Sequence, residues 1–217
     1  MSRVFKEFFE LTYWKITRYL QKGLRNAHYE YFYTTYFSLE ASFYANKTIL
    51  DIGCGPRGSL EWALMAKERI GLDPLVDKYL KMGANTHNMK YVKGYAENIP
   101  FADNYFDVIS AFNSLDHLDN PEKACQEIKR TLKAGGIFLL IVDIHKLPTF
   151  TEPQTLNWNF IYDYFPEFES INEKHLERVI KNKIYDNLRM NRIMDDNTKS
   201  TGVLTAILRK PGNLTSQ

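Results

Sequence analysis

A glycine-rich turn next to a buried carboxylate constrains this chain more than any other feature. The apolar run at 48–50 ends in Asp51, and a Gly-Cys-Gly turn at 53–55 follows. We expect a buried strand over 48–52, then a loop whose backbone comes close to a ligand, because glycine has no Cβ. A helix over 59–67 should follow, with free N–H groups at its N-terminus facing the ligand.

The residues around this turn narrow the class of ligand. Ser59 and Leu60 follow the last glycine where a P-loop needs Lys-Ser or Lys-Thr, so a P-loop is disfavoured. Together with the turn glycines, Gly58 fits the Gly-x-Gly-x-x-Gly pattern of dinucleotide sites, which is a weak signal alone. The carboxylate of Asp51 would repel a pyrophosphate. A ligand with a cationic amino-acid end therefore fits better than a dinucleotide.

A second carboxylate stands at the end of the next apolar segment. The segment 69–72 ends in Asp73, one strand–helix–strand unit after Asp51. An acidic residue at this place in an α/β unit accepts hydrogen bonds from ribose hydroxyls. A ligand that combines a ribonucleoside with an amino-acid end is S-adenosylmethionine.

At these residues the sequence resembles the class I S-adenosylmethionine-dependent methyltransferases, and more narrowly those with a methyltransferase type 11 domain. The resemblance covers roughly 48–145. It rests on four ordered segments, IleLeuAspIleGlyCysGly at 49–55, IleGlyLeuAspPro at 70–74, AlaGluAsnIleProPhe at 96–101, and the block from Phe106 to LeuLysAlaGlyGlyIlePheLeuLeu at 132–140. It implies a cofactor site made by Asp51, Gly53, Cys54, Gly55, Asp73, Pro74, Ala96, Glu97 and Asn113.

Two positions depart from the family pattern. Many relatives have an Asp that meets the adenine amino group where this chain has Tyr95, and Ala96 or Glu97 would then take over that contact. Many relatives also have glycine where this chain has Arg57, so the loop is expected to differ locally.

The family resemblance implies a Rossmann-like, doubly wound α/β fold, whose mostly parallel seven-stranded sheet has one antiparallel strand. We expect an N-terminal helical cap over 1–45, a methyltransferase domain over 46–217, and a lid-like aromatic insertion at about 146–170. Predicted strands lie near 48–52, 69–72, 89–93, 106–111, 136–143, 183–190 and 203–209, the last two joined by a polar turn at 195–202. Predicted helices lie near 2–22, 27–45, 59–67, 75–83, 121–133 and 171–181.

Bulk properties exclude several functional classes. The net charge of +2 over 217 residues gives no case for nucleic-acid binding. The two cysteines, Cys54 and Cys125, form no metal-ligating pattern, and we expect no metal site. No apolar run is long enough to span a bilayer, and the first residues do not read as a secretory signal. A cytoplasmic location is the simplest expectation.

The catalytic step leaves a weaker signal than cofactor binding. Methyl transfer needs alignment, exclusion of water and, for some acceptors, a general base. His145 and His117 follow predicted strands on the expected acceptor side and are the candidate bases, with His28 a weaker one. The Asn/Asp-Pro-Pro-Tyr/Phe motif of enzymes that methylate exocyclic amino groups of bases is absent after the fourth strand.

We therefore expect a small-molecule methyltransferase whose aromatic-rich helix and insertion wall the acceptor site, with O-methylation favoured only by its frequency. One alternative is a cofactor-binding module with little catalysis. Another is a methyltransferase docked on a membrane surface or a partner protein through its basic and aromatic helix at 2–22. The sequence does not indicate the oligomeric state.

Overall fold

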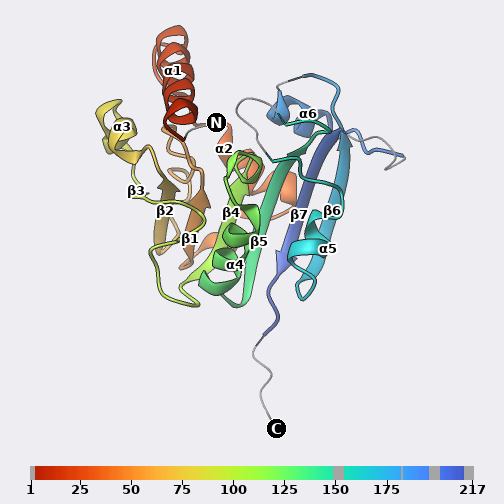
Figure 1. The fold of residues 1–217 in the computed structure, drawn as a ribbon. Helices are drawn as coiled ribbons and strands as arrows, with labels where there is room; N and C mark the ends of the chain where they lie inside the picture. Colours follow the sequence, from red (N-terminus) through yellow and green to blue (C-terminus); the bar gives the residue numbers. More distant parts are fainter. Residues whose placement is uncertain (1–2, 149–153, 182, 196–200, 213–217) are drawn as a thin grey trace.

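A single mixed sheet forms the centre of the computed structural model, which describes residues 3–148, 154–181, 183–195 and 201–212 (Figure 1). Within these residues seven strands lie in the order β3-β2-β1-β4-β5-β7-β6. They are β1 Thr48–Ile52, β2 Glu68–Asp73, β3 Lys90–Lys93, β4 Phe106–Phe112, β5 Leu132–Ile144, β6 Glu169–Glu177 and β7 Gly202–Arg209. The strand β7 is antiparallel to both of its neighbours. The predicted fold class is confirmed.

Helices cover both faces of this sheet. The α-helices of the described residues are α1 Arg3–Gln21, α2 Tyr29–Tyr33, α3 Val76–Lys81, α4 Pro121–Thr131, α5 Phe160–Tyr164 and α6 Ile184–Met190. Figure 1 shows α4 and α5 in front of the sheet and α2 behind it. Strand β1 serves both layers, because Leu50 and Ile52 pack with α4 and α5 whereas Ile49 packs with α2. This alternation is the period of two that a strand imposes.

The predicted helix over 59–67 is wrong. A series of turns spans 53–67, and no helix follows the glycine loop there. Leu60 and Ala63 of this segment are buried together with aromatic residues of α2 and of the short helix Ala41–Tyr44. The N-terminal segment, residues 29–44, thus occupies the face of the sheet that a helix after β1 would cover. The aromatic residues predicted as one helix over 27–45 are therefore part of the domain core.

That N-terminal segment is broken into three short helices for a local reason. Thr34 has backbone angles of −112° and −89°, outside the helical region, and ends α2. Ser38 has a left-handed φ of +57° and ends the next helix, Thr35–Phe37. The breaks turn Phe32, Tyr33 and Tyr44 towards the sheet, where all three are fully buried. Their burial outweighs the helical periodicity of the sequence.

The C-terminal third differs from prediction in two elements. The predicted helix over 171–181 is instead strand β6, and the predicted strand over 183–190 is helix α6. Strand β6 is the charged outer strand of the sheet, paired along one side with β7, which suits an edge strand. Asn187 of α6 holds the preceding loop, because its side chain accepts from the amides of Val179 and Ile180.

The described part of the predicted lid is packed into the core. Leu156, Phe160, Phe165 and Phe168 are buried among the side chains of α4 and β5. Part of the predicted lid, 149–153, lies outside the described residues, as does 196–200 of the predicted polar turn between the last two strands. The aromatic residues of 156–168 therefore build the front layer of the sheet.

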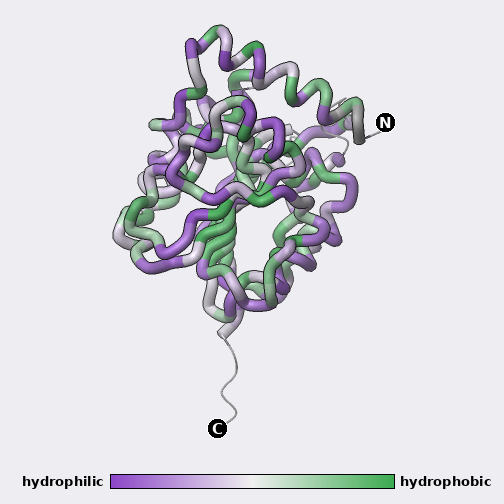
Figure 2. The backbone as a smooth tube through the Cα atoms, turned by 90° about the vertical axis from the view of Figure 1, so that its left-hand side faces the viewer, coloured by the Kyte–Doolittle hydropathy of each residue, from purple (hydrophilic) through white to green (hydrophobic). Residues whose placement is uncertain are grey.

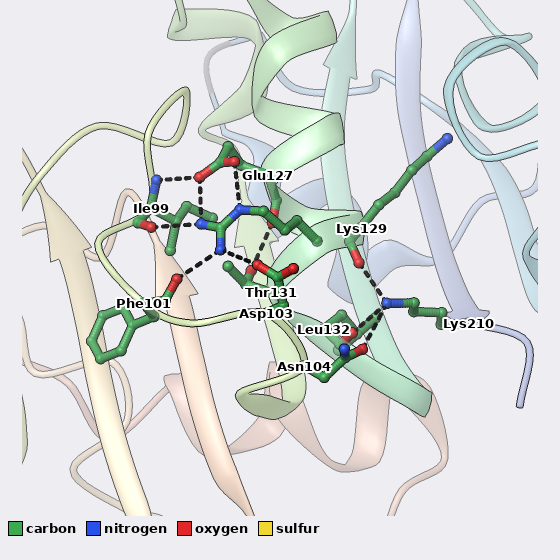
Figure 3. A network of polar contacts seen from close by, with 10 residues as sticks. Ile99, Phe101, Asp103, Asn104, Glu127, Lys129, Thr131, Leu132 and Lys210 are labelled. Carbon is green, nitrogen blue, oxygen red and sulfur yellow. Dashed lines mark hydrogen bonds and ion pairs between the residues drawn. The ribbon is translucent and has the colours of Figure 1, made fainter. Parts of the chain in front are cut away.

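An arginine holds the loop between β3 and β4, where the described chain again has no α-helix. The guanidinium of Arg130 donates to the carbonyls of Ile99 and Phe101, at 2.9 and 2.8 Å. It also pairs with Glu127 and Asp103 at 2.8 and 2.7 Å (Figure 3). Glu127 in turn accepts from the amide of Ile99. These contacts fix to α4 a loop that has no helix of its own.

Helix α1 lies outside the layers of the sheet. Figures 1 and 2 show it across the end of the molecule towards which β1 and β2 run. Its inner side contacts the turn after β1 and the residues after β2. In the described part of the chain, no helix is long and apolar enough to cross a membrane.

Candidate cofactor site

The glycine loop after β1 leaves no room for a side chain at Gly53 or Gly58. Gly53 and Gly58 have left-handed φ values of +70° and +71°. A Cβ added at Gly53 would lie 2.5 Å from the Cβ of Ser114, and one at Gly58 would lie 2.7 Å from Cγ of His87. Backbone angle and space thus both require glycine at these positions. The loop is folded tightly between the segment after β4 and the segment before β3.

Asp51, at the end of β1, is the centre of a buried hydroxyl network. Its carboxylate accepts from Ser59 and, at 2.8 Å, from Ser110 of β4. Because Ser110 donates its proton to Asp51, the hydroxyl of Tyr33, 3.0 Å away, donates to Ser110. Burial raises the pKa of Asp51 to about 6, and the hydroxyl donors oppose that rise.

Asp73, at the end of β2, holds the glycine loop through the backbone. It accepts from the amide of Gly55 at 3.2 Å and from that of Leu75 at 2.9 Å. Burial and the nearby carboxylate of Glu10 raise the pKa of Asp73 above its usual range. A group that donates hydrogen bonds to this carboxylate would therefore be favoured here. The predicted pair Asp51 and Asp73 thus lies at the same end of the adjacent parallel strands β1 and β2.

Helix α1 is a part of this site that the sequence analysis missed. The indole of Trp14 lies beside Gly55, where an added Cβ would come within 3.1 Å of Cζ2. Glu10, one turn earlier, accepts from the hydroxyl of Tyr79 at 2.7 Å. The signal was present in the sequence, because Glu10, Trp14 and Gln21 share one side of a helix whose other side is apolar.

Arg57 connects the glycine loop to the end of α1. This side chain is buried and donates to the carbonyl of Arg25 at 2.6 Å and to Gln21 at 3.1 Å. Its guanidinium lies 5.2 Å from the centre of the Trp14 ring, a cation–π distance. The position where relatives have glycine is thus used in this chain to bind its N-terminal helix.

The remaining predicted cofactor residues are Cys54 of the glycine loop and residues in the loops after β2, β3 and β4. Pro74 is half-buried beside Leu75, and Ala96 is buried. Glu97 accepts from the amides of Asp119 and Asn120, so it joins the loop after β3 to the loop after β4. Asn113 ends β4 with a left-handed φ of +54°, and its amide donates to Ile141. Cys54 is buried next to Gly71, as expected of a small packing residue.

Two buried oxygen atoms in these loops lack hydrogen bonds. Within the described residues, Oγ of Ser114 and Oε2 of Glu97 have no partner. Buried polar atoms are normally satisfied. Ser114 lies directly against Gly53, so its hydroxyl is at the edge of the glycine loop. A polar ligand seated along this loop would supply the missing partner, and the two carboxylates suit the ammonium and ribose groups of S-adenosylmethionine.

The candidate bases have different surroundings. His145, after β5, is buried, and its Nδ1 lies 2.8 Å from the carbonyl of Leu147. A carbonyl only accepts, so Nδ1 carries the proton and Nε2 is the basic nitrogen. His117 is more open, and its Nε2 lies 3.8 Å from the buried carboxylate of Asp116. Asp143, two residues before His145, pairs with Arg178 at 2.5 Å.

His28, the weaker candidate base, lies outside the glycine loop. It packs against Tyr29 and Tyr185 with ring centres 4.4 and 6.0 Å away. Burial and the charges of Arg57 and Arg189 lower the pKa of His28. The role of all three histidines in proton transfer stays a prediction.

Comparison with known proteins agrees with this geometry. Residues 50–140 match a family model described as a methyltransferase domain. This segment spans β1 to β5 and includes both carboxylates and the glycine loop. Residues 50–140 thus form a methyltransferase domain of the class I S-adenosylmethionine-dependent kind. S-adenosylmethionine is thus the cofactor of the family to which this domain belongs.

Curated relatives of this methyltransferase domain match over less than half of the chain. An uncharacterized methyltransferase, YcgJ, of Bacillus subtilis is 32% identical over 103 residues, which cover 45% of this chain and 41% of the relative. The ubiquinone/menaquinone biosynthesis C-methyltransferase UbiE of Idiomarina loihiensis is 32% identical over 97 residues, which cover 45% of this chain and 34% of the relative. The match therefore spans less than half the length of these proteins.

Solved structures extend the likeness of the methyltransferase fold over most of the chain. The [4+2]-cyclase SpnF has a TM-score of 0.60 and 19% identity, with 80% of this chain and 79% of that one covered. The YcgJ protein of Bacillus subtilis has a TM-score of 0.57 and 18% identity, with 82% and 99% covered. At this identity the likeness shows the fold alone. The same architecture is thus found in a protein named as a cyclase.

Proposed function

We propose that the protein binds S-adenosylmethionine along the glycine loop and transfers its methyl group to a small, apolar acceptor. The observation that carries this proposal is the placement of Asp51 and Asp73. They end adjacent parallel strands beside a loop in which Gly53 admits no side chain. Ligands of open α/β sheets bind at this end of the strands.

The residues of the loop would divide the cofactor between them. The carboxylate of Asp51 would attract the ammonium group of the methionine part, through water or directly. Asp73 would accept hydrogen bonds from the ribose hydroxyls in addition to those it accepts from Gly55 and Leu75. The hydroxyl of Ser114 would bind a polar atom of the methionine part. Tyr95, which is partly exposed, and Pro74 would line the adenine.

The bound cofactor would supply an activated methyl group on a sulfonium. The task of the protein is then to align the acceptor with that group and to exclude water. The buried His145 is suited to take a proton from the acceptor, because Nδ1 is held by Leu147 and Nε2 is the basic nitrogen. For a carbon acceptor that proton leaves the methylated atom, and for an oxygen acceptor it leaves the hydroxyl.

The names of the relatives support an apolar ring or prenyl acceptor. UbiE is named for quinone biosynthesis and for C-methylation. A solved geranyl diphosphate C-methyltransferase of Streptomyces coelicolor has the same fold, at a TM-score of 0.56. These names favour methylation of carbon over the O-methylation that frequency alone would favour.

A transfer assay tests this proposal. The purified protein would be incubated with S-adenosylmethionine, labelled in the methyl group, and a panel of hydroxylated aromatic and prenylated acceptors. We expect labelled product and one equivalent of S-adenosylhomocysteine. Cofactor binding without any product across the panel would contradict methyl transfer. It would favour the second candidate, a cofactor-binding protein with another activity, which the fold of the cyclase supports.

A further inference from the structure

The outward side of α1 is apolar although it faces solvent. Phe8, Tyr19 and Leu20 are 62%, 84% and 73% exposed. Other large apolar side chains lie on the same side of the helix, Phe5, Tyr13 and Ile16 among them. In a helix that only packs on its own domain, such residues turn inward. An exposed apolar stripe along one helix indicates a surface that another molecule or a membrane covers.

The inward side of α1 makes specific contacts with the domain, which fix the orientation of the helix. Glu10 accepts from Tyr79, and Gln21 accepts from Arg57. Trp14 lies between them, over Gly55. Together with the packing of Leu11 and Trp14 near Leu75 and Tyr79, these contacts hold this side of the helix inward, so the exposed apolar stripe is left outward. The outward position of the stripe is thus set by named bonds to the domain.

The charges beside the stripe are positive. Lys15, Arg18, Lys22 and Arg25 are all exposed along or just after α1. Of the two acidic residues in this helix, Glu10 is turned towards Tyr79. The partner that covers the stripe should therefore be apolar within and negatively charged at its surface. A second copy of this chain fits poorly, because it would place the same basic side chains next to one another.

We propose that α1 lies in the interface of an anionic lipid bilayer, with its aromatic and aliphatic stripe among the acyl chains and its basic residues at the phosphate groups. A helix of this kind binds in the plane of the membrane surface. It is not apolar enough to cross the membrane, in agreement with its mixed composition. The same helix covers Gly55 with Trp14, so the cofactor loop would lie at the membrane surface. Docking does not depend on the proposed methyl transfer.

Vesicle sedimentation with the full chain tests this proposal. Vesicles of phosphatidylcholine with phosphatidylglycerol would be compared with vesicles of phosphatidylcholine alone. We expect the protein to bind the anionic vesicles. Its affinity should be about tenfold lower for vesicles of phosphatidylcholine alone, and also about tenfold lower for the anionic vesicles at high salt. The double variant Phe8→Ser/Tyr19→Ser should lose about tenfold in affinity, since it removes two apolar anchors. The double variant Lys15→Glu/Lys22→Glu should also lose about tenfold in affinity, but only for the anionic vesicles.

Matched variants and a second measurement keep this proposal falsifiable. Leu147→Ser/Tyr162→Ser removes two exposed apolar side chains elsewhere and should bind vesicles as the unchanged protein does. Circular dichroism would verify folding, and the charge variant decides the matter if the apolar one does not fold. No sedimentation of the unchanged protein would overturn the proposal, as would binding that survives both α1 variants. A dimer by light scattering that Phe8→Ser/Tyr19→Ser converts to a monomer would overturn it in favour of self-association.

Discussion

Trp14 and Gly55 lie in contact, so that the N-terminal helix forms a wall of the glycine loop. An added Cβ at Gly55 would come within 3.1 Å of Cζ2 of Trp14. Arg57, two residues further, packs its guanidinium on the same indole ring. The side chain of Trp14 thus lies between two residues of the glycine loop and helps to hold helix α1 there. Substitutions in α1 that remove these contacts should therefore alter the packing of the glycine loop.

Replacing Trp14 should reduce stability, because its half-buried ring packs on Gly55 and Arg57. We expect Trp14→Ala to lower the free energy of unfolding by about 1–3 kcal/mol. Tyr19→Ala, on the outward side of the same helix, should change it by less than about 0.5 kcal/mol. Urea denaturation of both variants measures the difference. Equal losses would contradict the inward packing of Trp14.

The glycine at position 58 should be indispensable for space as well as for backbone angle. Gly58→Ala would place a methyl group 2.7 Å from the His87 ring at a φ of +71°. Gly83→Ala is the matched control, because its φ of +102° is also strained but no atom lies within 4 Å. We expect Gly58→Ala to cost at least about 1 kcal/mol more than Gly83→Ala in thermal or urea unfolding. If the two variants lost similar amounts of stability, the His87 ring would have to move aside at little energetic cost.

The buried Asp51 should give stability and cofactor binding opposite pH dependences. Its pKa in the folded protein is raised from 3.8 to about 6, so its ionisation opposes folding. The stability that comes from its neutral form is complete below pH 3.8 and is lost as pH rises to about 6. Binding of the cationic end of S-adenosylmethionine needs the ionised form, so cofactor affinity should rise across the same interval.

Comparison with Asp51→Asn isolates this effect from other groups that titrate. The difference in unfolding free energy between the two proteins should fall as pH rises from 4 to 6. The variant should also bind S-adenosylmethionine with little change in affinity over that interval. Parallel pH profiles for the two proteins would assign the dependence to another group.

Arg130 should contribute more to stability than an exposed ion pair. It binds two carbonyls and two carboxylates and holds the loop after β3 to α4 (Figure 3). We expect Arg130→Ala to cost about 2–3 kcal/mol, and Arg130→Lys to recover little, because one ammonium cannot replace the planar fork. Arg209→Ala breaks an exposed pair with Glu169 and should cost less than about 1 kcal/mol. Chemical denaturation of the three variants tests this ranking.

The sequence predicted the elements whose signals are local. Strands β1 and β2 were placed well because each apolar run ends in an aspartate, at Asp51 and Asp73. The predicted helix over 59–67 was wrong because the N-terminal segment covers the face of the sheet on which such a helix would pack. The local sequence pattern of 59–67 contains no information about that segment. Strand β6 was read as a helix because its polar residues become a strand only by pairing with β7.

The candidate site was predicted in part for the same reason. Asp51, Asp73 and the glycines are contiguous with their strands, so the sequence places them together. The contribution of α1 depends on contacts across the chain, such as Glu10 with Tyr79 and Trp14 with Gly55. Arg57 appeared in the sequence only as a departure from the family pattern. Its role became clear from its bonds to Gln21 and Arg25.

The most direct test of the cofactor site is isothermal titration of S-adenosylmethionine into the protein and its Asp73→Ala variant. Asp77→Ala is the control, because Asp77 is an exposed carboxylate on the neighbouring helix α3. We predict saturable binding to the unchanged protein and to the control, weakened by about 1–3 kcal/mol in Asp73→Ala. An absence of binding at millimolar cofactor would contradict the cofactor site, and unchanged affinity in Asp73→Ala would contradict the role of Asp73 at the ribose.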